Sequence, residues 1–179
     1  MFIFQLCIGV TISAQETNTA GKSGKTLNIG IGLGYYRYVG HSMPVVHADY
    51  EFDLLKNFTL APFISFYTYR NDYYYGNPHD GNRYYYHETV IPVGVKGTYY
   101  FDELLEAGNN WDFYLAGSLG FAIAFSYWDD NYTGDRNVYN GASPLFLDIH
   151  IGTEYHVNNR LGVFLDLSSG VSTIGLAIH

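Results

Sequence analysis

The sequence predicts an all-β protein folded as an eight-stranded antiparallel up-and-down transmembrane β-barrel. Three observations carry this prediction. Eight segments of about ten residues alternate between apolar and polar or small side chains, as membrane-spanning strands do. Their apolar phase carries no charge in mid-strand, and aromatic residues gather at the strand ends. Composition agrees, because 15% of the 179 residues are charged and 18% are aromatic, whereas roughly a quarter are charged in soluble domains.

Segment 145–156, LFLDIHIGTEYH, shows the alternation most clearly. Its odd positions are mainly aliphatic, and its even positions include Asp148, His150, Glu154 and His156. A period of two places these sets on opposite faces of a strand. In a soluble barrel the apolar face fills the core, but in a transmembrane barrel it meets lipid and the polar face lines the lumen. The other strands must decide between the two.

Three alternating segments precede the first long loop. Segment 27–36, LNIGIGLGYY, opposes aliphatic residues with glycine at every second position, which indicates a crowded face inside a small barrel. Segment 46–53 opposes apolar residues with histidine and acids, and residues 53–57 form a tight connection. Segment 58–69 alternates as well. Residues 70–83, RNDYYYGNPHDGNR, are predicted to form a polar, turn-rich loop.

Five alternating segments follow this loop: 87–100, 113–125, 145–156, 161–168 and 173–178. The acidic stretch 102–110 and the turn 158–160 connect neighbours on one side, and residues 128–143 form the longest loop on the other. Short turns at one end and longer loops at the other are typical of outer-membrane barrels.

The distribution of charge favours lipid outside the barrel. The polar phase holds His47, Asp49, Glu51, Asp53, Glu88, Lys96, Asp148, His150, Glu154 and Asp166. A soluble barrel would expose far more lysine and glutamate. Tyrosine and tryptophan at both strand ends match the interfacial girdles of membrane barrels. A one-residue slip would place Lys96 in hydrocarbon at a cost of about 2–4 kcal/mol, so the phase is well defined.

The first fifteen residues, MFIFQLCIGVTISAQ, are typical of a secretory signal peptide cut near Ala14 or Gln15. The basic start of such a peptide is missing, so we expect a truncated signal. Residues 16–25 form a polar leader, and residues 26–179 form the barrel. Cys7 is the single cysteine, so the mature chain would have no thiol chemistry. The net charge of −8 argues against nucleic acid as a partner.

The strand count, with LNIGIGLGYY near the start and DFYLAGSLGFAIAF in the middle, resembles small OmpA/OmpX-type outer-membrane β-barrels. Among these, the chain resembles the porin-like barrel proteins of Gram-negative, Bacteroidetes-type bacteria. The resemblance covers about residues 26–179 and implies an integral protein in contact with outer-membrane lipid. It is specific for architecture and not for function. Such barrels usually end on an aromatic residue, whereas this sequence ends at His179, so we expect a few residues to be missing.

The polar phase is the first candidate site. An eight-stranded barrel has an interior just wide enough for side chains to fill. We therefore predict a lumen plugged by a polar network, since buried charges need partners. The network comprises His47, Asp49, Glu51, Glu88, Lys96, Asp148, His150, Glu154 and Asp166. The excess of acids keeps a proton- or cation-conducting path as the alternative.

Tyrosines in the two long loops are the second candidate site: Tyr73, Tyr74, Tyr75, Tyr132 and Tyr139. Exposed tyrosine is favoured at recognition surfaces, although an aromatic girdle with ordinary loop packing explains these residues equally well. Residues 129–135 echo the start of a calcium loop, but Asn140 stands where a bidentate glutamate is needed. We expect a solvated loop there.

No metal, cofactor or catalytic residue is predicted. The histidines at 47, 150 and 156 could gather a metal, but a packed polar core explains them with fewer assumptions. A lipid-modifying enzyme needs serine, histidine and acid within reach near the interface, and adjacent His41 and Ser42 point to opposite faces of a strand. The sequence thus favours a non-enzymatic barrel with a structural or surface-interaction role. It would either stabilise the membrane or present loops 70–83 and 128–143 to another envelope protein or an extracellular surface. A narrow porin is the second hypothesis and a lipid-modifying barrel enzyme is the third.

Overall fold

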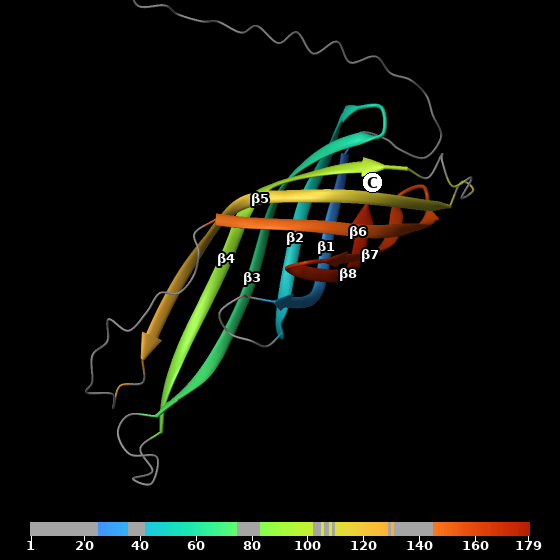
Figure 1. Ribbon diagram of the computed structural model, residues 1–179. Coiled ribbons are helices and arrows are strands. Elements are labelled where there is room, and N and C mark those ends of the chain that lie inside the picture. Colours follow the sequence, from blue (N-terminus) through green and yellow to red (C-terminus); the bar gives the residue numbers. More distant parts are fainter. Residues whose placement is uncertain are drawn as a thin grey trace, which may run out of the picture.

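Eight antiparallel strands close into one barrel in the computed structural model (Figure 1). The structure describes residues 25–35, 42–74, 83–101, 105, 108, 110–128, 130 and 145–179. The strands are β1 (Lys25–Tyr35), β2 (Ser42–Leu55), β3 (Phe58–Tyr74), β4 (Arg83–Tyr100), β5 (Trp111–Trp128), β6 (Leu145–Asn158), β7 (Leu161–Ser168) and β8 (Val171–Ile178). Within these ranges, no helix is long and apolar enough to cross a membrane.

Each strand pairs with the next in sequence, and β8 returns to pair with β1. At the closing seam Leu27 lies opposite Ile178 and Gly34 lies opposite Val171. Closure pairs every strand on both sides, which removes the exposed edges of an open sheet. The predicted eight-stranded up-and-down topology is therefore confirmed. The predicted signal peptide and polar leader lie outside the described residues, apart from Lys25, and that division of the chain stays a prediction.

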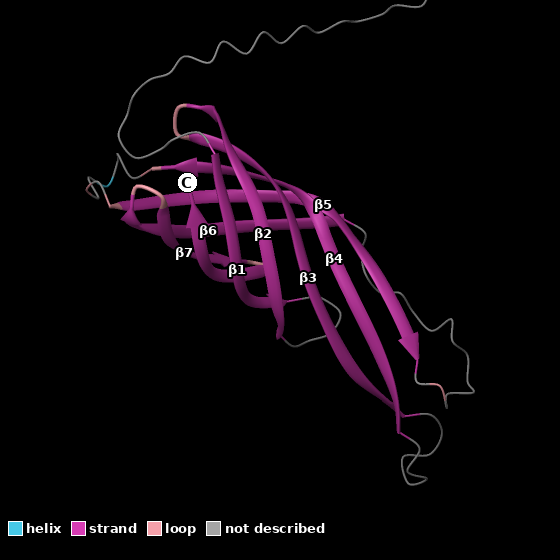
Figure 2. Cartoon of the chain, turned by 180° about the vertical axis from the view of Figure 1, so that it is seen from behind, coloured by secondary structure: helices cyan, strands magenta, loops and turns pink. Residues whose placement is uncertain are grey.

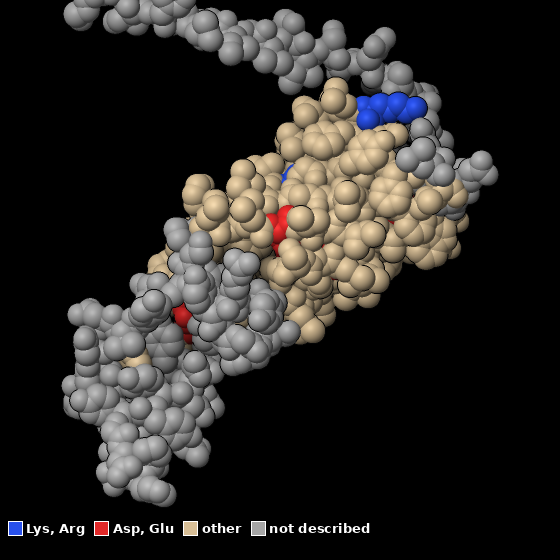
Figure 3. Space-filling model, viewed as in Figure 1, with Lys and Arg blue, Asp and Glu red and all other residues tan. Residues whose placement is uncertain are grey.

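The two phases of each strand have the burial expected of a membrane barrel. In β6 the aliphatic Leu147, Ile149 and Ile151 are exposed, and the alternate Asp148 and His150 are buried. Figure 3 shows an outer surface with very few charged side chains on the visible face. Polar residues inside and apolar residues outside suit hydrocarbon and not water. The predicted transmembrane phase is confirmed.

Glycines on the lumen side allow neighbouring strands to approach closely. Gly94 and Gly120 pair across β4 and β5, and a Cβ on either would lie within 2.3 Å of a carbonyl oxygen in the other strand. In β1, a Cβ on Gly32 would lie 1.9 Å from the carbonyl oxygen of Ser172. Such glycine positions bend the sheet, which an eight-stranded barrel needs in order to close. The crowded face predicted from the period-two glycines is thus confirmed at Gly32.

Three strands extend well beyond the others. Strands β3, β4 and β5 have 17, 18 and 18 residues, whereas β7 and β8 have 8 each. Figures 1 and 2 show them continuing past the rest of the barrel at one end. We call this the loop end, because residues 75–82 and 129–144 connect the strands there. The opposite end, with turns 56–57 and 159–160 and both Lys25 and His179, is the turn end.

The predicted loop boundaries at the loop end were wrong. Pairing of β3 with β4 continues until Tyr74 lies opposite Arg83, so residues 70–74 and 83 belong to strands. Trp128, placed in the second loop, is the last residue of β5. Tyrosine and tryptophan have high β-propensity and pair well across strands. In this stretch that preference outweighs the turn tendency of Asn71 and Asp72.

At the turn end, β2 continues to Leu55 and does not stop at Asp53 as the sequence suggested. The turn is closed by Asn57, whose φ of 62° is a left-handed conformation that asparagine tolerates. A register shift between Asp53 and Leu55 marks a bulge. Asp53 is exposed at this strand end, so its predicted place among the lumen residues was wrong.

Candidate functional site in the lumen

All nine residues predicted for the lumen network are buried, with at most 8% of each exposed. They come from β2, β4, β6 and β7, so strands far apart in sequence contribute to one interior. The structure brings eight of them into three groups, which we name the central, inner and mouth clusters. The ninth, Glu88, lies apart from them.

The central cluster is built around Asp49 and contains Asn28, His47, Ser65 and Lys96. Lys96 Nζ donates to Asp49 Oδ2 over 3.0 Å, and Asn28 Nδ2 donates to Asp49 Oδ1 over 3.0 Å. His47 Nε2 is 3.0 Å from Asp49 Oδ2, and its Nδ1 is 2.8 Å from Ser65 Oγ. The buried charge on Asp49 is therefore matched by a cation and by hydrogen bonds, which is the condition for a stable buried pair.

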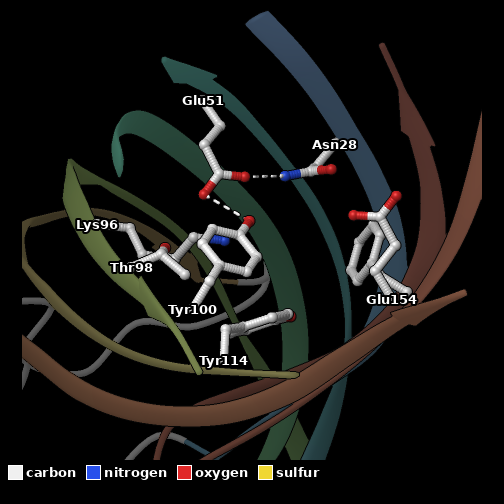
Figure 4. A pocket seen from close by; sticks show the side chains of 8 residues that line it. Asn28, Glu51, Lys96, Thr98, Tyr100, Tyr114 and Glu154 are labelled. Atoms are coloured by element: carbon white, nitrogen blue, oxygen red, sulfur yellow. Dashed lines mark hydrogen bonds between the residues drawn. The ribbon is translucent and has the colours of Figure 1, made fainter. Parts of the chain in front are cut away.

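Glu51 extends the central cluster toward the turn end. The hydroxyls of Thr59 and Tyr100 both donate to its Oε1, the latter over 2.9 Å. Asn28 Nδ2 lies 3.4 Å from the other carboxylate oxygen (Figure 4). These side chains border a cavity of about 10 Å³, which is room for about one water molecule. The cavity is lined by Asn28, Glu51, Lys96, Thr98, Tyr100, Tyr114, Glu154 and Phe164.

The inner cluster surrounds His150 of β6 and contains Tyr114, Ser118, Asp148 and Asp166. His150 Nδ1 is 2.8 Å from Asp166 Oδ1, and its Nε2 is 2.8 Å from Ser118 Oγ. The Tyr114 hydroxyl donates to Asp166 Oδ2 over 3.1 Å. Both ring nitrogens of His150 thus have short hydrogen-bond partners.

Asp148 has a structural task within the inner cluster. It accepts hydrogen bonds from the hydroxyls of Ser168 (2.8 Å) and Ser169 (2.6 Å) and from the backbone amide of Val171 (2.9 Å). These three donors are the last residue of β7, the first residue of the turn and the first residue of β8. A Cβ on Gly170 would lie 2.8 Å from Asp148 Oδ2, so glycine leaves room for the carboxylate. Asp148 therefore holds the β7–β8 turn in place.

Glu88 is buried in β4 toward the loop end. It precedes Lys96 by eight residues on the same strand, a distance of about 26 Å at the rise of a β-strand. Glu88 therefore lies nearer the loop end than Lys96 does.

An apolar layer lies between the clusters and the extended ends of β3, β4 and β5. It consists of five buried side chains: Met43, Val45, Tyr67, Val90 and Val171. Ala122, Ala124 and Phe146 pack against them. Phe63 continues the layer, with its ring centroid 5.7 Å from that of Phe146 and 5.9 Å from that of His47. The lumen is thus polar in its turn-end part and apolar nearer the loops.

The mouth cluster lies at the turn end and contains Asp112, Glu154, His156 and His179. His179 Nε2 is 2.7 Å from Glu154 Oε1, and His156 Nε2 is 2.9 Å from Asp112 Oδ2. The two imidazole centroids are 5.0 Å apart. The hydrogen bond that the protonated His179 ring donates to Glu154 raises the pKa of His179 above its ordinary value, because the carboxylate favours the charged ring.

Sequence reasoning missed Asp112 and His179 in this cluster. Asp112 shares the phase of Tyr114, and His179 shares the phase of Ala177, so the period-two signal would have found both. The predicted segments 113–125 and 173–178 each stop one residue short of these side chains.

The metal hypothesis for histidines 47, 150 and 156 does not match the structure. His150 and His156 are six residues apart on β6, about 20 Å along the strand. His150 is instead saturated by its hydrogen bonds, and His156 belongs to a different group at the mouth.

The tyrosines predicted for recognition are only partly covered by the structure. Tyr73 and Tyr74 lie in β3. Tyr75, Tyr132 and Tyr139 lie outside the described residues, as does nearly all of the calcium-like stretch 129–135. Their role in recognition stays a prediction.

An exposed apolar belt, a buried polar lumen and a closed eight-stranded sheet define the class of this protein. Aromatic residues border the belt, as expected for interfacial girdles: at the turn end Trp111 packs on Tyr155 with centroids 4.9 Å apart, and at the loop end Tyr127 stacks on His87 at 4.7 Å. The chain is a transmembrane β-barrel of the outer-membrane type.

Comparison with solved structures agrees with this class. Neisserial surface protein A is 10% identical, and the match covers 86% of this chain and 94% of that chain with a TM-score of 0.54. Ail of Yersinia pestis is 8% identical over 88% of this chain and 99% of that chain, with a TM-score of 0.47. The N-terminal β-barrel domain of Pseudomonas aeruginosa OprF is 11% identical over 87% and 95%, with a TM-score of 0.45.

No family model and no curated protein matches the sequence. The likeness to Neisserial surface protein A therefore shows the fold alone. It confirms the predicted resemblance to small eight-stranded outer-membrane barrels. The narrower resemblance to Bacteroidetes-type proteins stays a prediction.

Proposed function

We propose that this protein is a non-enzymatic outer-membrane barrel with a closed lumen, and that it acts through its surface. The observation that carries the proposal is the filling of the lumen at successive levels. Mouth, central and inner clusters hydrogen-bond internally, and the apolar layer follows them toward the loop end. A barrel filled in this way has no continuous pore, so its outer wall and its loops are the parts that can interact with other molecules.

The dimensions and polarity of the interior argue against the narrow porin. The cavity beside Glu51 has a volume of about 10 Å³, too little for a column of hydrated ions. Apolar constrictions also exclude water and block ions, and Met43, Val45 and Tyr67 provide one. The excess of buried acids favours cation conduction. However, the carboxylates of four of them accept hydrogen bonds from neighbouring protein groups, which occupy oxygens that a passing cation would need: Asp49, Glu51, Asp148 and Asp166.

An enzyme is the alternative that one feature favours. Ser118, His150 and Asp166 are joined by two contacts of 2.8 Å, in the order of a hydrolase triad. However, Ser118 and His150 are each 5% exposed, and the apolar layer lies between them and the loop end. Ser65, His47 and Asp49 are joined in the same order across the lumen, with the roles of the two ring nitrogens exchanged. Two such buried groups are better explained as a way of satisfying polar side chains.

The surface role is assigned to loops 70–83 and 128–143. Of these segments, residues 70–74, 83 and 128 end strands β3, β4 and β5 at the loop end, opposite the turns 56–57 and 159–160. Short turns of this kind face the periplasm in barrels of this class. Tyrosine offers large, rigid contact area at low entropic cost, which suits recognition of another envelope protein or an extracellular surface. The tyrosines concerned are Tyr73, Tyr74, Tyr75, Tyr132 and Tyr139.

Single-channel recording in planar bilayers tests the closed lumen. The purified, refolded barrel is expected to give no discrete conductance steps. Reproducible steps would refute the closed lumen and favour the narrow porin. A fluorophosphonate probe, which labels activated serine nucleophiles, tests the enzyme hypothesis in the same preparation. Covalent labelling of Ser118 or Ser65 would contradict the non-enzymatic assignment. For the surface role, a variant with the five loop tyrosines changed to serine should lose partners that the wild type retains from native membranes.

A further inference from the structure

Three side chains at the turn-end mouth bring potential metal ligands together. Glu154 and His156 are two residues apart on β6 and share one face, and His179 follows β8. One ligand atom from each lies within 4.8 Å of the other two. Glu154 Oε1 is 2.7 Å from His179 Nε2 and 3.7 Å from His156 Nδ1. The carboxylate oxygen is thus approached by an imidazole nitrogen from each side.

The remaining nitrogen of each imidazole is held by another residue. His156 Nε2 is 2.9 Å from Asp112 Oδ2, which leaves Nδ1 directed at Glu154. His179 Nδ1 is 3.0 Å from Thr26 Oγ1, which leaves Nε2 directed at Glu154. Metal-binding histidines characteristically donate their second N–H to a carboxylate or other oxygen, which fixes the tautomer and the orientation of the ring. Both imidazoles of the mouth cluster have such a partner.

The barrel backbone positions these groups independently of one another. The backbone amide of His179 donates to the carbonyl of Arg160 over 3.1 Å, which ties the end of β8 to the β6–β7 turn. Gly162 lies beneath the carboxylate, since a Cβ there would be 1.9 Å from Glu154 Oε1. The side chains of His156 and His179 are each 12% exposed. An ion can therefore reach them from the aqueous side of the mouth.

We propose that Glu154, His156 and His179 bind a divalent transition-metal ion of the zinc class at the turn end of the barrel. In a tetrahedral zinc site with bonds of about 2.0–2.2 Å, ligand atoms are about 3.3–3.6 Å apart. The two separations of Glu154 Oε1, 2.7 Å from His179 Nε2 and 3.7 Å from His156 Nδ1, lie just below and just above that range. Two imidazoles and one carboxylate suit zinc-like ions better than magnesium or calcium. Water completes the coordination, and binding displaces the proton shared between His179 and Glu154.

The position of the site gives the ion a structural effect. An ion bound there would join β6 to His179, the residue after β8, beside the seam where β8 pairs with β1. A ligand that binds only the folded state raises its stability. The ion would therefore fasten the barrel near its closure.

Cobalt(II) and zinc titrations of the full chain, refolded in detergent micelles, test the proposal. Cobalt(II) should bind one equivalent per chain with visible absorption bands of a tetrahedral site, and zinc should displace it. His156→Ala, His179→Ala and Glu154→Gln should each lower the affinity at least tenfold. The matched control is His87→Ala, which removes a histidine at the loop end and should leave the affinity unchanged.

Two variants that retain all three ligands make the test independent of a folding defect. Asp112→Asn removes the carboxylate behind His156 and should weaken binding about tenfold to a hundredfold. Gly162→Ala should weaken it too, because the methyl group displaces the Glu154 carboxylate. Folding is checked by heat-dependent electrophoretic mobility. The proposal is overturned if the folded wild type binds no cobalt or zinc at micromolar concentrations. It is also overturned if folded variants of the mouth cluster bind as tightly as His87→Ala.

Discussion

Strand β6 carries two acid–x–histidine pairs on the same lumen face, and the barrel treats them differently. In the inner cluster, Asp148 and His150 are buried, and every polar atom of the histidine ring has a hydrogen-bond partner from another strand. In the mouth cluster, Glu154 and His156 have neighbours that leave nitrogen atoms directed at one shared oxygen. The same spacing thus gives a saturated packing unit in one place and a candidate ligand set in the other.

The difference lies in what the neighbouring strands supply. Ser118 and Asp166 reach His150 from β5 and β7, because both strands pair with β6 at that level. At the mouth, β5 supplies Asp112 at the position that Ser118 holds in the inner cluster, and His179, which follows β8, brings a second imidazole to Glu154. A motif along one strand therefore specifies which residues face the lumen, and the adjoining strands determine which hydrogen-bond partners or ligands those residues have.

The largest loss of stability is expected from breaking the buried ion pair between Lys96 and Asp49. Lys96→Met leaves Asp49 buried beside an apolar chain and should lower the free energy of unfolding by about 3–5 kcal/mol. Denaturant unfolding of the barrel in lipid vesicles measures this. Adding Asp49→Leu to the same chain should recover much of the loss, because the uncompensated charge is then gone. A loss below about 1 kcal/mol for Lys96→Met would show that water solvates the interior.

The two β6 histidines give the direct comparison. His150→Ala removes a partner from both Ser118 and Asp166 and should cost about 2–4 kcal/mol, since each buried polar group left unpaired costs about 1–3 kcal/mol. His156→Ala, measured with a chelator present, should cost about 1 kcal/mol or less, as for a partly solvated ion pair. Equal losses in the same unfolding experiment would mean that the mouth is packed as tightly as the inner cluster.

A smaller effect is expected from filling a glycine position between the clusters. A Cβ at Gly152 would lie 2.2 Å from the ring of Tyr114, whose hydroxyl donates to Asp166. Gly152→Ala should therefore cost about 1–3 kcal/mol by overpacking. Gly117→Ala is the control, because a Cβ there has no neighbour within 4 Å among the described residues. Similar stability of the two variants would indicate that Tyr114 moves aside freely.

The nine lumen residues named from the sequence were all found buried, because a period of two assigns a face without any knowledge of neighbours. The same rule explains the limits of the prediction. Asp112 and His179 were missed because strand ends are set by pairing with the adjacent strand. For the same reason Asp53 was wrongly assigned to the lumen and Trp128 to a loop. The loop tyrosines were named from composition alone, and their role rests on the proposed function.

The sequence by itself determined the number of strands, the inverted phase that makes this a membrane barrel, and the lumen face of the nine polar residues of the predicted network. These follow from local alternation and from the cost of placing charge in hydrocarbon. Only the tertiary structure decided which polar groups meet. Lys96 reaches Asp49 across 47 residues of chain, and His179 reaches Glu154 across 25. Such contacts arise when register and closure bring distant strands to one level of the lumen, and no spacing within a single strand specifies them.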